Sequence, residues 1–577
     1  MWLCRLALGA SLALLAAGCV SGDIGGGESL PGDAARAPFD AVAPDDDAGQ
    51  APPRDAAVSD AAAKDAAMPP MDAGPPKPPV TFDPPGRGFS GPLTLKLTAG
   101  DADAVLHYTI DGSLPSASSP AVSGPITIST TTLVRVISVK AGAMSPVFNQ
   151  SYFELDPSVQ SFSSNLPVLI AHMQGGSAPQ PSNRSYVPGM VGVFTPGSAR
   201  TQLAGSAQHT SRMGIKIRGR SSRSSDKPSY SLELWGAADE DAPASMLGLP
   251  ADGDWVLYAP YDWDKSMLHN AFAYDLSRRI GRYAPRTQFC ELFLVTGATT
   301  KVTMANYVGI YVFTERLTRS KDRVAIDKLQ VDEVVDPARS GGYIVKVDEP
   351  DMQSEAFSAA GLTFVYVDPD VDEIVSAQKQ YIADYLNASK RAVSAGDGKD
   401  PMSGKHYSEL MDVPSFIDHH ILSVLLKNPD AFALSSYFYK DRDGKLFAGP
   451  LWDFDLAMGA NDPWGQRSVD PTYWGPNTTA MMFRRSFWGP LFNHSEFATA
   501  YWARWDELLA STFTSAKFRG VIDAWEMQLT EAEQRNRTRW PKGAPRNNSY
   551  PDEIDALETW LDARLGWIKA NKGVVPQ

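Results

Sequence analysis

Apolar residues follow two different periods along the chain. Up to about residue 350 they form short strand-like runs, and one stretch, Lys265–Ile280, has the three- and four-residue spacing of an amphipathic helix. The predicted strands are Leu166–Ile170, Met213–Ile217, Tyr230–Leu234, Asp254–Tyr258, Glu291–Val295, Val308–Phe313 and Tyr343–Val347. Helical spacing then dominates over Asp368–Ala395, Val413–Lys427, Ser495–Thr512, Ser515–Arg535 and Pro551–Lys572. We therefore predict an α+β unit over residues 160–577, with a mostly β lobe, a mostly helical lobe and a ligand-binding cleft between them.

A smaller β pattern precedes this unit, over residues 80–155. Runs such as Leu93–Leu97 and Leu133–Val139 are separated by Gly, Pro, Asp and Ser, which is typical of a small β-sandwich. From Ser21 to Pro79 large apolar side chains nearly vanish, and Ala, Pro, Asp and Gly replace them. Such a segment cannot bury enough surface to offset its chain entropy, so residues 19–79 are predicted to be a disordered tether.

Residues 1–18 have the features of an export signal. Arg5 precedes an apolar run, Leu6–Ala17, that is too short to span a bilayer of roughly 30 Å. The run continues into Gly and Cys, which resembles a bacterial lipobox with Cys19 as the lipidated residue, although Ala16 stands where Leu is usual. Val20 is not Asp, and the resemblance to sorting rules favours an anchor in the outer membrane or at the cell surface. An ordinary secretory signal with a chance cysteine is the alternative.

The composition narrows the classes of function. The formal charge is −14 over 577 residues, which argues against nucleic acid as the main partner. The chain has 3 cysteines, an odd number without zinc-finger spacing, so neither a disulfide framework nor a cysteine zinc site is predicted. Cys290 lies in an apolar run and is expected to be a small buried side chain rather than a nucleophile.

Polar residues with metal-binding chemistry stand in two predicted loops. Asn428 and Asp430 follow a helix that Pro429 stops, and a predicted β-hairpin delivers Asp453 and Asp455 just beyond its second strand. If strand geometry continues, residues two apart face one side, so these last two carboxylates share one space. Three carboxylates and an amide on adjacent loops suit Mg²⁺ or Mn²⁺, since hard cations take oxygen ligands. The alternative is that these groups only cap the helix and tie the hairpin.

The order Asn-x-Asp, hairpin, Trp-Asp-x-Asp-x-x-x-Gly resembles the core pattern of the CotH family, the spore-coat-protein-H-like kinases with an atypical protein-kinase fold. The resemblance implies a catalytic loop in which Asp430 acts as base or orients the substrate hydroxyl, while Asn428 orients the loop or binds metal. It also implies that Asp453 binds the metal and that Asp455 is a second ligand or supports the first.

Further blocks agree with that family in the same order. Lys216–Ser222 and Lys227–Leu232 resemble its Arg-Gly-x-Ser and Lys-Pro-Tyr block, in which backbone amides, hydroxyls and a lysine lie near phosphate. The residues that the resemblance assigns to the ATP site are Arg218, Ser221, Ser222, Lys227, Glu315 and Lys346. A surface hairpin with solvated bases is the alternative for the first block, and structural roles are the alternative for Glu315 and Lys346. The chain departs from the family pattern at one point, because Ser435 or Ser436 stands where many relatives have Asn. The resemblance therefore does not settle which residue is the second metal ligand.

The smaller β pattern carries a resemblance of its own. The stretch His107–Pro115 resembles the signature turn of the chitobiase/hexosaminidase C-terminal-like domain, an Ig-like sandwich, with Asp111 and Gly112 at the tight reversal. The resemblance leaves two roles open, glycan binding and a spacer. We favour the spacer, because the sequence identifies no exposed aromatic platform.

Together these features predict an exported, lipid-anchored kinase that uses ATP with Mg²⁺ or Mn²⁺ to phosphorylate Ser or Thr hydroxyls of an envelope or surface protein. One alternative is an inactive surface-anchored structural or adhesion protein with a kinase-like fold, since ATP is scarce beyond the inner membrane. The other is a carbohydrate-active enzyme, which also uses paired carboxylates. Asp453 and Asp455, only two residues apart, suit one cation better than opposite faces of a sugar.

Overall fold

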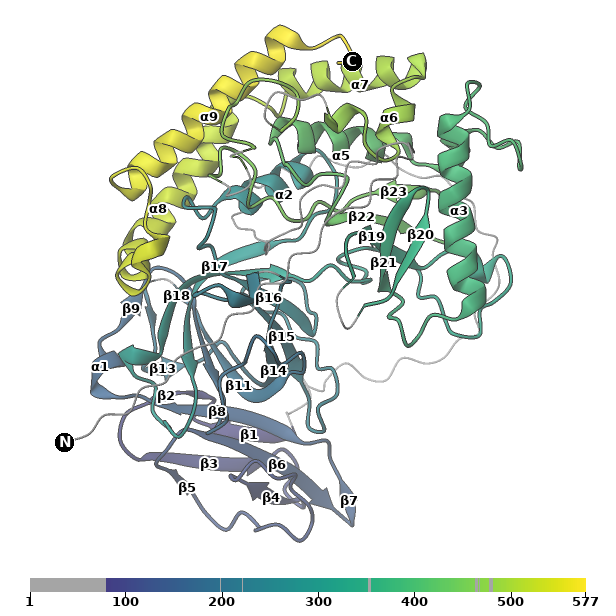
Figure 1. Cartoon of the computed structure of the whole chain (residues 1–577). Coiled ribbons are helices and arrows are strands. Elements are labelled where there is room, and N and C mark those ends of the chain that lie inside the picture. Colours follow the sequence, from purple (N-terminus) through teal and green to yellow (C-terminus); the bar gives the residue numbers. More distant parts are fainter. Residues whose placement is uncertain are drawn as a thin grey trace, which may run out of the picture. The chain divides into compact units, whose positions relative to one another are not determined.

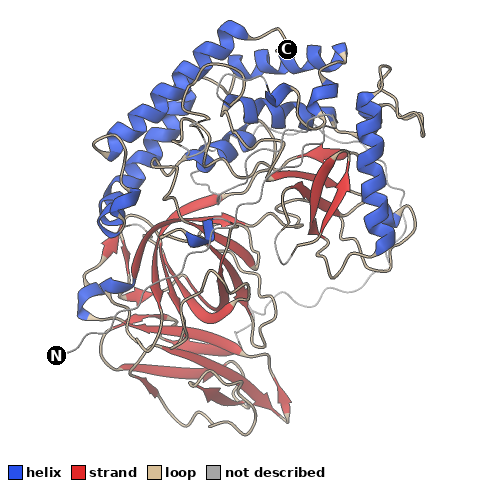
Figure 2. Ribbon diagram, in the orientation of Figure 1, coloured by secondary structure: helices blue, strands red, loops and turns tan. Residues whose placement is uncertain are grey.

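The computed structural model describes residues 79–576 except 198, 221, 351–353, 462–464, 466 and 477–480. The predicted signal peptide, nearly all of the predicted tether, Cys19 and Ser221 therefore lie outside the described residues. The described part is mixed α+β, as Figures 1 and 2 show. Within it, no helix combines the length and apolar character needed to cross a membrane.

The first described element is a β-sandwich. Its strands are β1 (Val80–Asp83), β2 (Arg87–Phe89), β3 (Leu93–Ala99), β4 (Val105–Thr109), β5 (Ile126–Ile128), β6 (Thr132–Lys140), β7 (Ala143–Met144) and β8 (Phe148–Glu154). One sheet has the order β1-β3-β5, and the other has the order β13-β2-β8-β6-β4, in which β13 (Gly205–Ser206) comes from the next part of the chain. Leu95, Val134 and Tyr152 are buried in one apolar cluster between the sheets, so the predicted sandwich is confirmed.

The next strands close into a β-barrel in the order β10-β11-β14-β15-β16-β18-β17. Their bounds are β10 (Val168–His172), β11 (Val187–Phe194), β14 (His209–Ile217), β15 (Tyr230–Trp235), β16 (Asp254–Tyr258), β17 (Thr287–Val295) and β18 (Tyr307–Glu315). Neighbouring strands are antiparallel except β10 and β17, whose parallel pairing completes the circle. Alternate residues such as Leu232 and Trp255 form a buried cluster that includes the thiol of Cys290, as expected for that residue.

A separate 5-stranded antiparallel sheet has the order β20-β21-β19-β22-β23. Its strands are β19 (Tyr343–Val347), β20 (Ala356–Ala359), β21 (Leu362–Asp368), β22 (Ser436–Lys440) and β23 (Leu446–Ala448). The last two form the predicted hairpin. The prediction of a helix from Asp368 is wrong at its start, because that residue ends β21 and α3 (Ser376–Ser394) begins later. Pro369 disfavours helical backbone at the residue before it, which accounts for the difference.

Helices make up most of the chain after this sheet. The longer ones are α2 (His269–Arg279), α3, α5 (Val413–Leu425), α7 (Ser495–Ala510), α8 (Ser515–Arg539) and α9 (Tyr550–Asn571). Short elements are α1 (Pro157–Gln160), α4 (Tyr407–Leu410), α6 (Trp488–Leu491), β9 (Ser163–Ser164) and β12 (Thr201–Gln202). Helix α5 contacts α2, α7 and α9, while α8 lies against β18 of the barrel (Figure 1). All side chains of α5 from Ser415 to Leu425 are buried, so this helix carries the following loop on a fixed support.

Candidate functional site

The loop after α5 is tied to the turn beyond the β22–β23 hairpin. Lys427 leaves the helical region with φ of 55°, so the chain turns away from the helix axis. The side-chain amide of Asn428 then donates from Nδ2 to the main-chain oxygen of Asp453 over 2.9 Å. Its Oδ1 accepts from the backbone N–H of Asp430 at 3.1 Å. Asn428 therefore joins the segment that contains Asp430 to the segment that contains Asp453.

The turn that carries Asp453 and Asp455 is not a continuation of the hairpin strand. Strand β23 ends at Ala448, and Asp453 has φ of 67°, so the expected strand alternation at these two carboxylates is wrong. Both carboxylates nevertheless act electrostatically on the same buried side chain, Tyr258. Burial raises the pKa of Tyr258 well above its usual value, and the negative charges of Asp455 and neighbouring aspartates, Asp453 among them, add to that shift. Negative charge is thus concentrated at this turn.

Helix α2 holds the acidic turn through its main chain. The hydroxyl of Tyr274 accepts from the backbone N–H of Asp453 at 3.2 Å, and Oδ1 of Asn270 accepts from the N–H of Phe454. Nδ1 of His269 lies 3.2 Å from the main-chain oxygen of Asp455. Asn270 and Tyr274 are four residues apart and so share one face of the helix. That spacing is a signal that sequence reasoning could have used, although nothing in it names the turn as the partner.

Side chains from the hairpin and from the later loops complete the environment of the two loops. Oγ of Ser435 donates to Oδ2 of Asp453 at 2.9 Å, and Nη1 of Arg467 lies 3.3 Å from Oδ1 of Asp430. Nη1 of Arg485 donates to the main-chain oxygens on both sides of Asp430, those of Pro429 and Ala431, at 3.2 Å each. Sequence reasoning missed both arginines, because they come from a stretch without a recognisable motif.

Two basic residues of the predicted nucleotide site lie near the acidic turn. Arg218 comes from the barrel and Lys346 from the 5-stranded sheet. The guanidinium carbon of Arg218 lies 5.3 Å from the centre of the Trp452 ring, next to Asp453 in the chain. Burial lowers the pKa of Arg218. Nζ of Lys346 pairs with Asp348 and lies 5.9 Å from the centre of the Tyr437 ring.

Tyr437 links these groups electrostatically. Burial raises the pKa of Tyr437, the positive charges of Lys346 and Arg218 oppose that shift, and the negative charge of Asp453 favours it. Although burial opposes it, the interactions with Tyr437 and Asp348 raise the pKa of Lys346, which stays charged at neutral pH. Arg218 and Lys346 therefore lie beside the Trp452 and Tyr437 rings, and both act with Asp453 on the charge of Tyr437.

Lys227 does not contact this neighbourhood. Its side chain is 1% exposed, and Nζ donates to the main-chain oxygen of Ile310 at 2.6 Å and to Asn536 of α8 at 2.9 Å. A phosphate would have to displace both partners, so the prediction that Lys227 binds phosphate is wrong, as is the alternative of a solvated base. Lys227 instead joins the barrel to α8.

Glu315 also has a structural role. It is fully buried at the end of β18, and it accepts from the backbone N–H of Arg286 at 2.8 Å and from the hydroxyl of Tyr283 at 3.1 Å. The guanidinium of Arg286 pairs with it at 2.7 Å. Of the two roles that the sequence leaves open, the structural one holds. Ser222 is buried at the start of a short 3-10 helix, Ser222–Ser224, and Ser221 lies outside the described residues.

The donor set fits a divalent cation that arrives with a nucleotide. Asp453 and Asp455 offer carboxylate oxygens, and Mg²⁺ is commonly held by one or two carboxylates together with phosphate oxygens and water. Across the described residues, no three or more His, Cys, Asp or Glu side chains are grouped so as to hold a metal. The described residues therefore do not form a complete protein cage, and a cation here would need further oxygen ligands, such as water or phosphate.

Comparison with known protein families matches residues 215–568, more than half of the chain, to the family described as CotH kinase protein. The chain belongs to the CotH kinase family. The match begins in β14 and includes Asn428, Asp430, Asp453 and Asp455, so the CotH domain contains the whole site described above. Residues 84–149 match the chitobiase/beta-hexosaminidase C-terminal domain, so both resemblances seen in the sequence are confirmed, in the predicted order. No curated protein matches the chain.

Proposed function

We propose that the CotH domain is an extracytoplasmic protein kinase that transfers the γ-phosphate of ATP to Ser or Thr hydroxyls of an envelope or surface protein. The observation that carries the proposal is the hydrogen bond from Asn428 to the main chain of Asp453. It fixes the loop that would orient the acceptor against the turn that would hold the metal, and phosphoryl transfer depends on that relative placement.

Each group near the site has a role in this proposal. Asp453 and Asp455 would hold Mg²⁺ or Mn²⁺, which neutralises phosphate charge when it is bound with the nucleotide. Arg218 and Lys346 carry positive charge toward the same space and would attract the phosphates. Asp430 would orient the acceptor hydroxyl and take its proton. The barrel and the helical part would be the two lobes of an atypical kinase fold.

The proposed location follows from the chain before the described residues. A lipid on Cys19 would anchor the protein to the outer membrane or the cell surface, and residues 19–79 would give the folded part reach. The sandwich would then act as a spacer between that tether and the CotH domain. Glycan binding is its alternative role.

One observation favours a second candidate, an inactive structural or adhesion protein. Arg467 pairs with Asp430 at 3.3 Å, so the carboxylate that would face the acceptor hydroxyl already contacts a side chain of the protein itself. A transfer assay therefore decides between the two functions.

The assay compares the full chain with Asp453→Asn, using labelled ATP, Mn²⁺ or Mg²⁺, and envelope extract as acceptor. We expect the variant to lose at least about a hundredfold in phosphate incorporation, because it removes a metal ligand but keeps the side-chain shape. ATP with Mn²⁺ should raise the melting temperature of the wild type and not of the variant. Asp506→Asn is the matched control, since that exposed aspartate pairs with Lys572 near the C-terminus. Absence of both transfer and nucleotide stabilisation in the wild type would favour the structural protein.

A further inference from the structure

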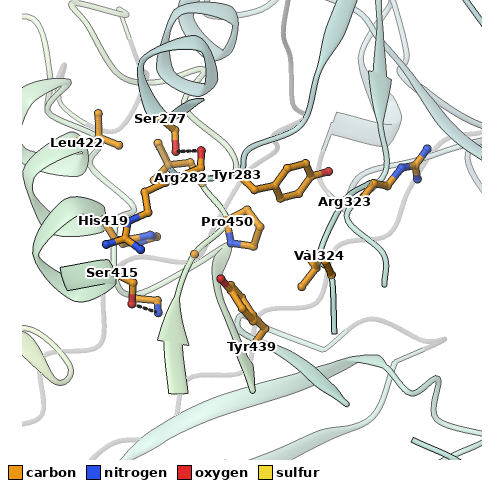
Figure 3. A pocket seen from close by; sticks show the side chains of 14 residues that line it. Ser277, Arg282, Tyr283, Arg323, Val324, Ser415, His419, Leu422, Tyr439 and Pro450 are labelled. Carbon is orange, nitrogen blue, oxygen red and sulfur yellow. Dashed lines mark hydrogen bonds between the residues drawn. The ribbon is translucent and has the colours of Figure 1, made fainter. Parts of the chain in front are cut away.

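A partly open cavity lies behind the β22–β23 hairpin. Its volume is about 200 Å³, and its lining comes from α2 and the segment after it, from α5, from β22 and β23, and from residues 323–325 (Figure 3). Gly449, Pro450 and Leu451 form part of the lining, and these residues lead along the chain to Asp453. The cavity is not part of the site described above, because none of Asn428, Asp430, Asp453 and Asp455 lines it.

His419 of α5 gives the cavity a hydrogen-bonding group. The side chain is 7% exposed, and its Nδ1 is buried without a hydrogen-bond partner among the described residues. Across from it stands Gly449, where a Cβ atom would lie 3.8 Å from Nδ1. The glycine therefore leaves open the space that any other residue would fill. A buried polar atom with open space before it is a position that a ligand can satisfy.

The charged groups of the lining already have partners. Nε of Arg282 donates to Asp418 at 2.6 Å. Arg323 lies 3.2 Å from Asp252 through Nε, and it donates to the main-chain oxygen of Asp254 at 2.8 Å. A charged ligand would have to compete with these pairs, and at the buried Arg323 that competition is costly. The cavity is therefore suited to a neutral molecule.

We propose that this cavity binds a neutral single-ring molecule, a phenol or a ring alcohol, whose hydroxyl group donates to Nδ1 of His419. Apolar cavities of about 150 Å³ bind benzene, so a volume of about 200 Å³ accommodates a ring with one small polar substituent. Leu422, Val324 and Pro450 supply apolar contact for the ring. This site goes beyond phosphoryl transfer, and binding here does not depend on whether the CotH domain is active.

The test measures binding of phenol and of toluene to the full chain by calorimetry. We expect saturable phenol binding in the wild type and weaker binding of toluene, which lacks the hydroxyl. His419→Phe keeps the ring but removes Nδ1, so phenol binding should weaken about tenfold while toluene binding stays the same. Ala325→Trp places a large ring at the exposed edge of the cavity and should weaken both ligands at least about tenfold. Ala298→Trp, on an exposed barrel loop, is the matched control and should change neither.

Three results would overturn the proposal. Wild-type protein that binds no phenol up to about 10 mM has a cavity that holds water alone. Phenol binding that Ala325→Trp leaves intact takes place elsewhere on the molecule. Equal loss of phenol and toluene in His419→Phe would show that shape, and not the nitrogen, sets affinity. Ala325→Trp changes an exposed residue, so it remains informative if His419→Phe does not fold.

Discussion

At the scale of single residues, Ser435 contacts one of the two carboxylates of the acidic turn, that of Asp453. The hydroxyl donates to a carboxylate oxygen over 2.9 Å, and Ser435 is one of the two serines, with Ser436, that stand where the family resemblance implies Asn. A serine hydroxyl that donates to a carboxylate holds that carboxylate in place. Serine has no amide oxygen of the kind that Asn could offer to a cation. The residue thus acts as a positioning group for a metal ligand in the proposed mechanism.

Replacing Ser435 with Ala should therefore change metal dependence more than stability. We expect the Mn²⁺ concentration for half-maximal transfer to rise about tenfold, since supporting partners of metal ligands typically contribute that much to affinity. Ser435 is half-buried, so the free energy of unfolding should fall by only about 1 kcal/mol. Ser436→Ala is the control, because its hydroxyl bonds only to the main chain of its own loop, at Phe432 and Leu434. An unchanged metal requirement in Ser435→Ala would contradict the assignment.

The buried imidazole of His419 leads to a second prediction, about how the free energy of unfolding depends on pH. Burial lowers the pKa of His419 from 6.5 to about 3. Between these values the unfolded chain binds a proton that the folded protein does not, so stability from this residue is complete above pH 6.5 and falls as the pH falls. Well below pH 6.5 the slope is about 1.4 kcal/mol per pH unit. Denaturant unfolding of wild type and His419→Phe between pH 6 and pH 4.5 should show that slope as a difference between the two. Parallel curves would mean that His419 is protonated in the folded state.

At the scale of elements, local patterns were sufficient for much of the secondary structure. The predicted strands at Asp254–Tyr258 and Tyr343–Val347 match β16 and β19 at both ends. The closure of the barrel through parallel β10 and β17 was not predictable, because that pairing joins segments more than a hundred residues apart. The sheet that places β19 beside the hairpin is another long-range pairing of this kind. The spacing of apolar residues within one segment does not indicate which distant segment it pairs with.

The same limit applies to the site. Asn428, Asp430, Asp453 and Asp455 could be found because each follows an element that the sequence marks clearly. Their mutual placement depends on α2, Arg467 and Arg485, whose contacts with the loops cross long distances in the chain. Lys227 and Glu315 matched a family pattern but are buried, since a pattern gives residue type and order without burial.

Helix α2 gives the prediction at this scale. Tyr274→Phe removes the acceptor of the N–H of Asp453 and leaves that donor in a buried place, so the free energy of unfolding should fall by about 1–3 kcal/mol. Phosphate transfer should fall as well, because the turn loses part of its support. Tyr385→Phe is the matched control, since its hydroxyl donates to the main-chain oxygen of Leu410 at 2.9 Å, with a longer 3.5 Å contact to that of Gly444 in the hairpin turn, and to neither of the two loops. It should cost comparable stability and leave transfer per folded molecule unchanged. Equal transfer by both variants would show that α2 does not position the turn.

At the scale of the whole described chain, the sandwich and the barrel share structure. Strand β13 follows β10 and β11 in the chain, yet it pairs with β2 of the sandwich, Gly205 opposite Gly88. Arg135 of the sandwich donates to the main chain of Ala237 beyond β15. The main chain of Leu155 forms a further bridge with Val302, which lies between β17 and β18 of the barrel. A spacer joined only by a linker would have none of these contacts, so we expect the two parts to unfold together.

Gly88 allows a direct test of that coupling. A Cβ atom at this position would lie 2.0 Å from the main-chain oxygen of Leu203, so Gly88→Ala must separate the two parts or distort them, at a cost of about 1–3 kcal/mol. Residues 80–155 contain no Trp, and every Trp except Trp2 lies within the CotH domain, so in protein without residues 1–18 tryptophan fluorescence follows that domain. If the parts unfold together, Gly88→Ala should lower the unfolding midpoint seen by tryptophan. Gly124→Ala, a sandwich position with open space around it, should leave the midpoint unchanged. The contrary result is a tryptophan transition with the same midpoint in Gly88→Ala as in the wild type, together with a separate calorimetric transition at lower temperature. That result would mean that the sandwich unfolds independently.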